Sequence, residues 1–489
     1  MTGPAPRTPG RGRRPAARTV SPARRVALDV LIAVREQDAY ANLLLPARIR
    51  QAGLSRADAA LATELCYGTL RMLGNYDRVI ALAARRPVAE IDPPILDVLR
   101  LGAHQLLALR TPAHAAVNES VEQARRVGSR SATGFANGVL RQIARRDAED
   151  WMREVVEHAD GPDDRLAARS SHPTWIIRAF RRALEADGRA GELEELLAAD
   201  NAAPAVNLVT LPGLDVDGPG GDAAGWADEA TAGLGPNRYS PVGHVLDRGD
   251  PDLVSSGSRG RIRVQDEGSQ LVALALSRAR PIAAGERWLD LCAGPGGKAA
   301  LLAAEARAGG ASLVANEAVP ARADLVRRAL AAIPAGTAEV RVGDGRLIGD
   351  EHPHGFDRIL VDAPCTGLGA LRRRPEARWR KRPGDVPALT TLQRELADAA
   401  VAALAPGGLL AYATCSPHPA ETRMLVADLL AAHGERLRPL PTARILTGIC
   451  RTDPGLGDTT VVQLWPHRHG TDAMFLALFE ARGPATVSR

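Results

Sequence analysis

The sequence of 489 residues contains few aromatic side chains and no long hydrophobic segment. Aromatic residues make up 3% of the chain, so we expect cores built from Ala, Leu and Val. No apolar run approaches the roughly 20 residues needed to span a bilayer. Residues 1–20 are rich in Pro, Gly and Arg and lack the apolar core of a signal peptide. We therefore expect a cytoplasmic protein that makes no contact with a membrane.

Cysteine and lysine are also scarce. The cysteines are Cys66, Cys292, Cys365, Cys415 and Cys450. They form no Cys-x-x-Cys pair and need not be oxidised in the cytoplasm. Because the histidine pairs of the chain lie in loops without cysteine partners, we expect no metal site. Lys298 and Lys381 are the only lysines in a chain with 62 basic residues, so the lysine at 298 indicates a need for a compact ammonium group.

Basic residues gather in two places, although the net charge of +5 is only mildly basic. The first cluster is an arm at residues 1–20 that contains Arg7, Arg11, Arg13, Arg14 and Arg18. The second contains Arg372, Arg373, Arg374, Arg378, Arg380, Lys381 and Arg382. Solvated surface arginine is one interpretation of such clusters. For the second cluster we favour phosphate contacts with a nucleic acid, because it follows the candidate cofactor crevice described below.

The hydrophobic pattern divides the chain into regions. Residues 1–20 form the disordered basic arm, and residues 21–150 repeat apolar positions at helical spacing, which predicts an all-helical domain. Residues 151–261 predict a small α/β connecting domain, in which the Ser- and Gly-rich segment 255–260 indicates a flexible link or a long hairpin loop. Residues 262–482 form the last domain.

The last domain alternates strands with helices, which is typical of a doubly wound sheet with helices on both faces. The predicted strands are 288–292, 312–317, 338–343, 356–362, 408–413, 459–464 and 473–479. The predicted helices are 265–278, 299–308, 320–332, 388–405 and 419–433. The predicted fold class of this domain is therefore α/β.

The stretch from Trp288 to Lys298 predicts a strand, a tight glycine turn and the start of a helix. Such a junction presents backbone N–H groups to an anionic or carboxylate-bearing ligand. Cys292 and Ala299 stand where a Walker loop needs Gly and Ser or Thr, which argues against nucleoside triphosphate binding. A nucleotide-like cofactor is our hypothesis, and a turn without any ligand is the alternative.

Acidic residues end the next three apolar runs, at Glu317, Asp344 and Asp362. The carboxyl ends of parallel strands meet in one ligand crevice, so these carboxylates should lie near the glycine turn. Glu317 is then placed to accept hydrogen bonds from ribose hydroxyls.

Two cysteines follow adjacent predicted strands, Cys365 after Asp362 and Cys415 after Thr414. A single buried cysteine is usually an inert small hydrophobe. Two cysteines beside a cofactor turn instead indicate a nucleophilic site, in which the surroundings must help to ionise a thiol. The residues alone do not decide which thiol attacks.

These motifs together resemble the RNA cytosine-5 methyltransferase family. The resemblance is carried by Leu291–Lys298, Gly343–Arg346, Asp362–Cys365, Arg373–Pro375 and Tyr412–Ser416. The last two predicted strands resemble the antiparallel edge of a class I (Rossmann-like) methyltransferase. The family often has Ala, Thr and Asp where Gly294, Ala299 and Glu317 stand, and Glu317 still offers a carboxylate.

The helical domain narrows the resemblance. Four motifs of this domain look like the NusB fold, which is a helical RNA-binding module. These motifs are Tyr67–Thr69, Asp97–Gly102, Val117–Glu119 and Ala136–Arg141. Together the two domains resemble the Sun, Fmu or RsmB branch, which methylates small-subunit (16S) ribosomal RNA. Ribosomal RNA is then the expected partner, and a monomer is the expected state.

The resemblance implies a role for each site residue. S-adenosylmethionine would be held by Cys292, Ala293, Gly294, Pro295, Gly296, Gly297, Lys298, Glu317, Asp344 and Asp362. Cys415 would add to carbon 6 of cytosine, Asp362 would hydrogen-bond or protonate ring nitrogen 3, and Cys365 would assist product release. RNA contacts would come from Arg372, Arg373, Arg374 and Arg378.

Two other functions remain open from the sequence. A transfer RNA cytosine-5 methyltransferase would share every catalytic residue, and only the helical domain speaks against it. A non-catalytic NusB-like RNA-binding factor would not need Cys415 or the glycine turn, and both are present.

Overall fold

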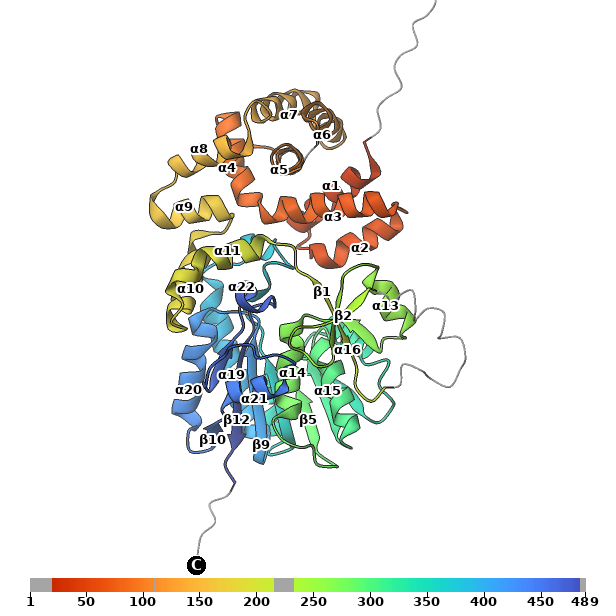
Figure 1. Ribbon diagram of the computed structural model, residues 1–489, viewed down its shortest axis with the longest axis vertical. Helices are drawn as coiled ribbons and strands as arrows, with labels where there is room; N and C mark the ends of the chain where they lie inside the picture. Colours follow the sequence, from red (N-terminus) through yellow and green to blue (C-terminus); the bar gives the residue numbers. More distant parts are fainter. Residues whose placement is uncertain (1–19, 110, 215–232, 484–489) are drawn as a thin grey trace, which may run out of the picture. The chain divides into compact units, whose positions relative to one another are not determined.

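The computed structural model describes residues 20–109, 111–214 and 233–483, and the chain forms two compact units (Figure 1). Their bounds are Met1–Ala159 and Asp160–Arg489. The basic arm predicted at residues 1–20 lies outside the described residues, apart from Val20. The boundaries predicted for the four regions stay predictions.

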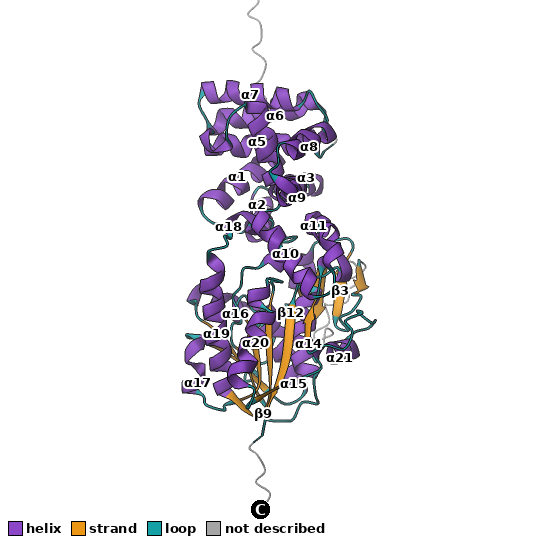
Figure 2. Ribbon diagram, turned by 90° about the vertical axis from the view of Figure 1, so that its left-hand side faces the viewer, coloured by secondary structure: helices purple, strands orange, loops and turns teal. Residues whose placement is uncertain are grey.

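The described part of the first unit consists of helices, as Figure 2 shows. They are α1 (Pro22–Glu36), α2 (Ala41–Gln51), α3 (Arg56–Arg71), α4 (Leu73–Ala84), the 3-10 helix η1 (Val88–Glu90), α5 (Pro93–Leu107), α6 (Ala113–Val127), α7 (Arg130–Ile143) and α8 (Ala148–Glu157). Prolines in the first turn start α1 and α5, where a missing N–H costs nothing. Helix α5 is buried on most sides and packs against α3, α4, α6 and α7.

The second unit begins with helices and a small sheet. The helices are α9 (Gly161–Ser170), α10 (Thr174–Ala186), the 3-10 helix η2 (Ala190–Glu192) and α11 (Leu193–Asn201). The sheet has the order β2-β3-β1-β4 and is antiparallel throughout, with β1 (Val206–Thr210), β2 (Leu234–Pro236), β3 (Gly243–Leu246) and β4 (Ile262–Val264).

The flexible link or long hairpin loop predicted at 255–260 needs correction, because residues 255–257 belong to a helix and residues 258–260 form a turn after it. Helix α13 (Pro251–Gly257) begins with a proline, and the side chain of Asp250 accepts a hydrogen bond from the Asp252 N–H at 2.9 Å. Such a cap satisfies an N–H that the helix itself cannot pair. Val254 is buried and fastens the helix to the small sheet.

The α/β fold class is confirmed by the large sheet of the second unit. Its order is β10-β12-β9-β8-β5-β6-β7, and β11 pairs with β12. The strands are β5 (Arg287–Asp290), β6 (Ser312–Glu317), β7 (Ala338–Val342), β8 (Phe356–Asp362), β9 (Leu404–Thr414), β10 (Leu437–Pro439), β11 (Val461–Gln463) and β12 (Phe475–Ala481). The run from β7 to β9 is parallel, whereas β12 is antiparallel to its three partners β9, β10 and β11.

One detail of the predicted sheet needs correction. The last two strands were expected to form its edge, but the short β10 occupies that edge and β12 lies between β10 and β9. Only three residues of β10 pair, and just one of them is fully buried, so the segment carries almost no periodic signal.

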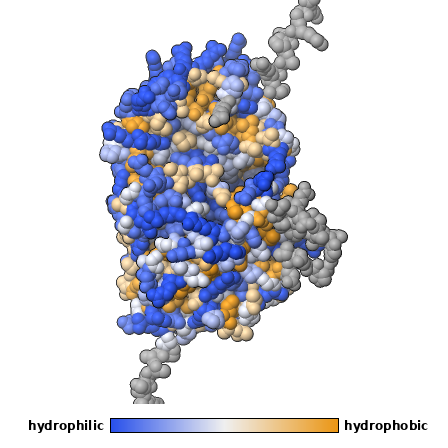
Figure 3. All heavy atoms as spheres, viewed as in Figure 1, coloured by the Kyte–Doolittle hydropathy of each residue, from blue (hydrophilic) through white to orange (hydrophobic). Residues whose placement is uncertain are grey.

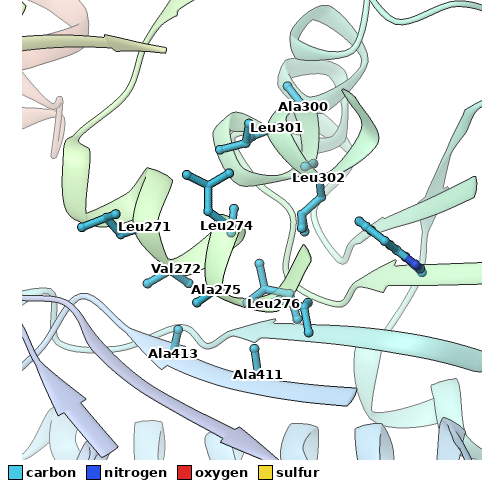
Figure 4. Packing of buried hydrophobic residues seen from close by; sticks show 14 of the residues in the cluster. Leu271, Val272, Leu274, Ala275, Leu276, Ala300, Leu301, Leu302, Ala411 and Ala413 are labelled. Atoms are coloured by element: carbon cyan, nitrogen blue, oxygen red, sulfur yellow. The ribbon is translucent and has the colours of Figure 1, made fainter. Parts of the chain in front are cut away.

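Helices cover both faces of this sheet. They are α14 (Glu267–Arg278), α15 (Gly297–Ala308), α16 (Pro320–Ala329), α17 (Ile348–Glu351), α19 (Asp385–Ala403), α20 (Arg423–His433) and α21 (Thr442–Ile449). Figure 4 shows side chains of α14 and α15 packed together with Ala411 and Ala413 of β9. The intervening Leu410 and Tyr412 pack with α19 and α20 on the other face. Because residues 409–413 of β9 are buried on both faces, this part of the strand has the continuous apolar sequence typical of a central strand.

On the face seen in Figure 3, hydrophilic and hydrophobic residues are interspersed. Within the described ranges, no helix has both the length and the apolar character needed to cross a membrane.

Candidate active site

The candidate site lies at the carboxyl edge of the parallel strands. Asp290, Glu317, Asp362 and Thr414 are the last residues of β5, β6, β8 and β9. The chain runs outward from β5 through β6 to β7 and then crosses back to β8, which makes the space between β5 and β8 the topological switch point. Ligands of open α/β sheets bind at such a point.

The glycine turn joins β5 to α15, as the sequence predicts. Gly296 has φ +107° and precedes the first residue of α15. A Cβ atom at Gly296 would lie 2.4 Å from Ala329 Cβ and 3.0 Å from Val326 Cα. A side chain here would therefore collide with α16, and glycine is required for packing as well as for conformation.

Glu317 ties the turn to β6. Its Oε2 accepts the Gly294 N–H at 3.1 Å, and its Oε1 accepts the Val319 N–H at 3.0 Å. The guanidinium of Arg322 lies 3.5 Å from the same carboxylate and donates to Gly294 O at 2.7 Å. The carboxylate predicted to bind ribose is thus buried and held in one orientation.

Asp344 lies at the same edge, two residues beyond Val342, which is paired with Glu317. The Asp344 carboxylate accepts hydrogen bonds from the backbone and the guanidinium of Arg346. The hydrogen bond from the Arg346 side chain lowers the pKa of Asp344 below its usual value. Asp344 is therefore a half-buried, ionised acceptor at the same edge of the sheet as the turn.

Lys298 connects the turn to β8. Its Nζ lies 2.9 Å from Asp362 Oδ2. Burial works against the ammonium, but the charge of Asp362 and this hydrogen bond raise the pKa of Lys298 above its usual value. A short, compact cation fits this contact, as the rarity of lysine in the chain indicated.

Asp290 is a site residue that the sequence analysis missed. Burial, together with the charge of Asp362, raises the pKa of Asp290 to about 8, although Lys298 opposes the shift. The signal was available, because an acidic residue at the buried end of a strand directly before a glycine turn is unusual for a core position.

The two thiols are brought together, as predicted from their strand ends. The Sγ atoms of Cys365 and Cys415 are 3.5 Å apart. A hydrogen bond from Cys365 lowers the pKa of Cys415, and the charges of Arg374 and Lys298 act in the same direction against burial and Asp362. The same hydrogen bond, together with burial, raises the pKa of Cys365. These shifts favour Cys415 as the thiolate and Cys365 as the hydrogen-bond donor.

The backbone around the thiols is equally fixed. The Gly369 N–H donates to Cys415 O at 2.9 Å, and the Ala473 N–H donates to Gly369 O at 2.8 Å. A Cβ at Gly369 would come within 2.2 Å of Ala473 O. The loop after Cys365 is thus closely packed between β9 and the segment leading to β12.

The arginine cluster needs a correction. Arg372 and Arg378 are buried, with 6% and 0% of their surfaces exposed, so they cannot be surface phosphate contacts. Arg372 donates to Gly470 O at 2.9 Å, and Arg378 donates to Asn201 Oδ1 at 2.7 Å and Asp200 O at 2.8 Å. Both guanidinium groups tie the loop to distant parts of the second unit. Composition cannot distinguish such internal arginines from exposed ones.

The other two predicted RNA contacts differ from each other. Arg373 pairs with Asp266 and Asp472, at 2.6 Å and 3.0 Å. Arg374 is exposed. Of the four arginines predicted to bind RNA, Arg374 is therefore the one whose side chain combines exposure with proximity to Cys415.

Comparisons with known proteins match both units. The family model described as 16S rRNA methyltransferase RsmB/F matches residues 280–480, and the NusB family model matches residues 21–145. A Mycobacterium tuberculosis protein, named only as a candidate methyltransferase, is 50% identical over 468 residues that cover 96% of this chain and 98% of that protein.

More distant relatives carry a fuller name. The ribosomal RNA small subunit methyltransferase B of Pseudomonas putida is 33% identical over 93% of this chain and 97% of its own length. The crystal structure of PH0851 has the same fold, with a TM-score of 0.76, 22% identity, and coverage of 94% of this chain and 99% of its own.

Proposed function

Because the chain belongs to the RsmB/F family of 16S rRNA methyltransferases, we propose that it transfers a methyl group from S-adenosylmethionine to carbon 5 of a cytosine in small-subunit ribosomal RNA. The observation that carries the proposal is the pair of thiols, Cys365 and Cys415, with sulfur atoms 3.5 Å apart beside the glycine turn. Methyl transfer to carbon 5 needs a nucleophile at carbon 6, and a thiolate is suited to that task.

The crevice fits the proposed cofactor. A Cβ atom at Gly297 would meet no atom nearer than 3.8 Å, so the backbone at the start of α15 is open to close approach. The first N–H groups of a helix have no acceptor within the helix and can face a carboxylate. Residues Cys292–Lys298 would hold the amino acid end, Glu317 the ribose hydroxyls, and Asp344 and Asp362 further polar groups. When bound, S-adenosylmethionine would supply the methyl group and leave as S-adenosylhomocysteine.

The chemistry follows from the state of the two thiols. Cys415 Sγ forms a bond to carbon 6, and the electron pair of the 5–6 double bond makes carbon 5 the nucleophile for the methyl group. Asp362 would hydrogen-bond or protonate ring nitrogen 3 as charge develops there, with the Lys298 ammonium, 2.9 Å from Asp362 Oδ2, as the source of the proton. Loss of the carbon 5 proton then restores the double bond as the Cys415 bond to carbon 6 breaks, and Cys365 assists this step.

RNA contacts are proposed for the exposed part of the arginine cluster. We assign the phosphate contact to the exposed Arg374, with the half-buried Lys381 and the exposed Arg382 beyond it, whereas Arg372, Arg373 and Arg378 hold the loop. A cytosine must leave its stack to reach a thiol behind such a loop, which is the usual strategy of enzymes that modify a base.

Bisulfite sequencing of cellular RNA tests the proposal, because 5-methylcytosine resists conversion. Cells that lack the protein should lose one methylated cytosine in 16S ribosomal RNA. The parent protein should restore it, and the Cys415→Ala variant should not. Loss of a methylated cytosine in transfer RNA instead would support the transfer RNA alternative. No loss in either RNA would favour a non-catalytic role.

A further inference from the structure

A buried carboxylate outside the predicted site connects both thiol loops. Glu421 ends the 3-10 helix η5 (Pro419–Glu421) and has 0% of its surface exposed. Its Oε1 accepts the Thr366 N–H at 2.7 Å and the Gln393 side-chain amide at 3.1 Å. The Thr366 hydroxyl donates to its other oxygen, Oε2. Only donors face this carboxyl group, which suits an anion.

The same network reaches the neighbours of both cysteines. Thr366 follows Cys365, and Ser416 follows Cys415. The hydroxyl groups of Thr366 and Ser416 are 3.0 Å apart. Since the Thr366 proton goes to Glu421, the Ser416 hydroxyl donates to Thr366. One carboxylate thereby fixes the backbone on either side of the sulfur pair.

Further hydrogen bonds fix Glu421 itself. The Tyr412 hydroxyl donates to the Glu421 backbone oxygen at 2.8 Å. The Gln393 amide that binds Glu421 also donates to Pro364 O at 2.8 Å, one residue before Cys365. Because nearly every polar group in this network has a hydrogen-bond partner, the network holds one arrangement. Loss of the Glu421 carboxylate would leave buried donors without their acceptor.

The charges around the sulfur pair are distributed unequally. Lys298 and Arg374 act on Cys415, whereas the charge of Glu421 acts on Cys365 and disfavours its ionisation. Asp362 disfavours ionisation of both thiols, Tyr412 is a further titratable neighbour of Cys365, and His418 is one of Glu421. The cations and Glu421 therefore bias the pair toward the same arrangement, with the proton on Cys365.

We infer that Glu421 is a positioning residue that keeps Cys365 as the hydrogen-bond donor toward Cys415 and so makes Cys415 the attacking thiolate. The inference rests on the proposed cytosine-5 chemistry, but it assigns a task to a residue that touches neither substrate nor cofactor. The two thiols have no histidine base among their hydrogen-bond partners. The inference explains why a glutamate is buried next to the loop that carries Cys365 instead.

The test compares the reactivity of the two thiols. The full chain is treated with iodoacetamide over a pH series, and mass spectrometry measures alkylation at Cys365 and Cys415 separately. In the parent, Cys415 should react first. Glu421→Gln keeps the size and the contact with the Thr366 N–H but removes the charge, and it should shift the alkylation ratio toward Cys365 by about tenfold, the effect of one pKa unit on a thiolate fraction. The matched control is Glu435→Gln, which removes the same charge from an exposed site.

Enzyme kinetics provide the second measurement. Glu421→Gln should lower kcat for RNA methylation by about tenfold, while KM for S-adenosylmethionine stays unchanged, because Glu421 does not contact the glycine turn. Glu421→Asp keeps the charge and should recover part of kcat. If Glu421→Gln does not fold, Thr366→Val removes the hydroxyl link while keeping the backbone N–H, and it should shift the alkylation ratio in the same direction.

An unchanged alkylation ratio in the folded variants would overturn the role of Glu421. A parent enzyme that makes no 5-methylcytosine in 16S ribosomal RNA would instead contradict the proposed function. The two failures are distinguishable, because alkylation needs neither RNA nor turnover.

Discussion

Arg373 joins the start of α14 to the segment before β12 by donating to Asp266 at 2.6 Å and to Asp472 at 3.0 Å. Both carboxylates are nearly buried, and burial raises the pKa of Asp472 to about 6 despite the arginine. The side chain of Arg373 is 23% exposed and its positive charge is the link between two acidic groups that would otherwise repel each other. Arg374, the next residue, is exposed and serves as a natural comparison.

The first prediction separates these two arginines. Arg373→Ala should destabilise the second unit by about 3 kcal/mol, because it leaves the carboxylate of Asp266 without its cation and Asp472 with only Arg372, at 3.5 Å. Arg374→Ala should change stability by less than about 1 kcal/mol. It should weaken RNA binding and reduce the slope of log affinity against log salt concentration by about one, the contribution of one phosphate contact. Thermal unfolding and RNA titrations at several salt concentrations measure these effects. A stable Arg373→Ala variant with a reduced salt slope would make Arg373 an RNA contact after all.

The second prediction concerns the glycine turn. Gly296→Val should weaken binding of S-adenosylmethionine at least ~100-fold, which is about 2.7 kcal/mol, because its Cβ would collide with α16 and displace the turn. Gly336→Ala is the matched control, since Gly336 has φ +84° but a Cβ there would meet nothing within 4 Å. The control should lose only about 1–2 kcal/mol of stability and no affinity. Calorimetry that finds equal affinity for the valine variant and the parent would place the cofactor elsewhere.

Much of the second unit could be predicted because its signals are local. The glycine turn, the buried β8 and β9 and the helices between them show their periodicity in single stretches of sequence. The approach of Cys365 to Cys415 was also predictable, because both follow parallel strands that end at one edge.

The features that were missed depend on contacts between distant residues. Arg378 looks like any surface arginine until the ends of α9 and α11 supply Ser171, Asp200 and Asn201 as acceptors 177 or more positions away. Glu421 likewise looks like an ordinary helix-start residue, because its partners Thr366 and Gln393 lie 55 and 28 positions away. No pattern within a single segment carries such information.

The third prediction concerns pH. Burial raises the pKa of Asp200 to about 7, against the charges of Arg378 and Arg372, from the usual 3.8. Between about pH 4 and 7 the folded chain therefore keeps a proton that the unfolded chain has released, so this group makes stability fall as pH rises. Asp200→Asn stays neutral and should gain stability relative to the parent by up to about 4 kcal/mol between pH 4 and pH 8.

Denaturant unfolding of both proteins at each pH measures this difference. The control is Asp350→Asn, at an exposed position, whose stability should run parallel to that of the parent. A constant difference between Asp200→Asn and the parent would mean that Asp200 is ionised in the folded protein at all these pH values.

The last prediction separates the two thiols. Cys415→Ala should abolish methylation and any denaturant-resistant link to RNA, because no bond to carbon 6 can form. Cys365→Ala removes the hydrogen bond that lowers the pKa of Cys415, so attack should slow by about tenfold per pKa unit. Attack should still occur, because Lys298 and Arg374 remain to favour the thiolate. Release should be impaired more than attack, so this variant should stay bound to its RNA.

Denaturing gel electrophoresis after incubation with RNA and S-adenosylmethionine distinguishes these outcomes. Cys365→Ala should give a shifted band and Cys415→Ala none. Cys450→Ala should behave like the parent, since burial raises the pKa of Cys450 to about 12 and its neighbours are Glu267 and Asp453 rather than the site residues. A shifted band for Cys415→Ala but not for Cys365→Ala would make Cys365 the nucleophile. That result would also reverse the role of Glu421, whose charge would then oppose the attacking thiolate, while leaving cytosine-5 methylation as the reaction.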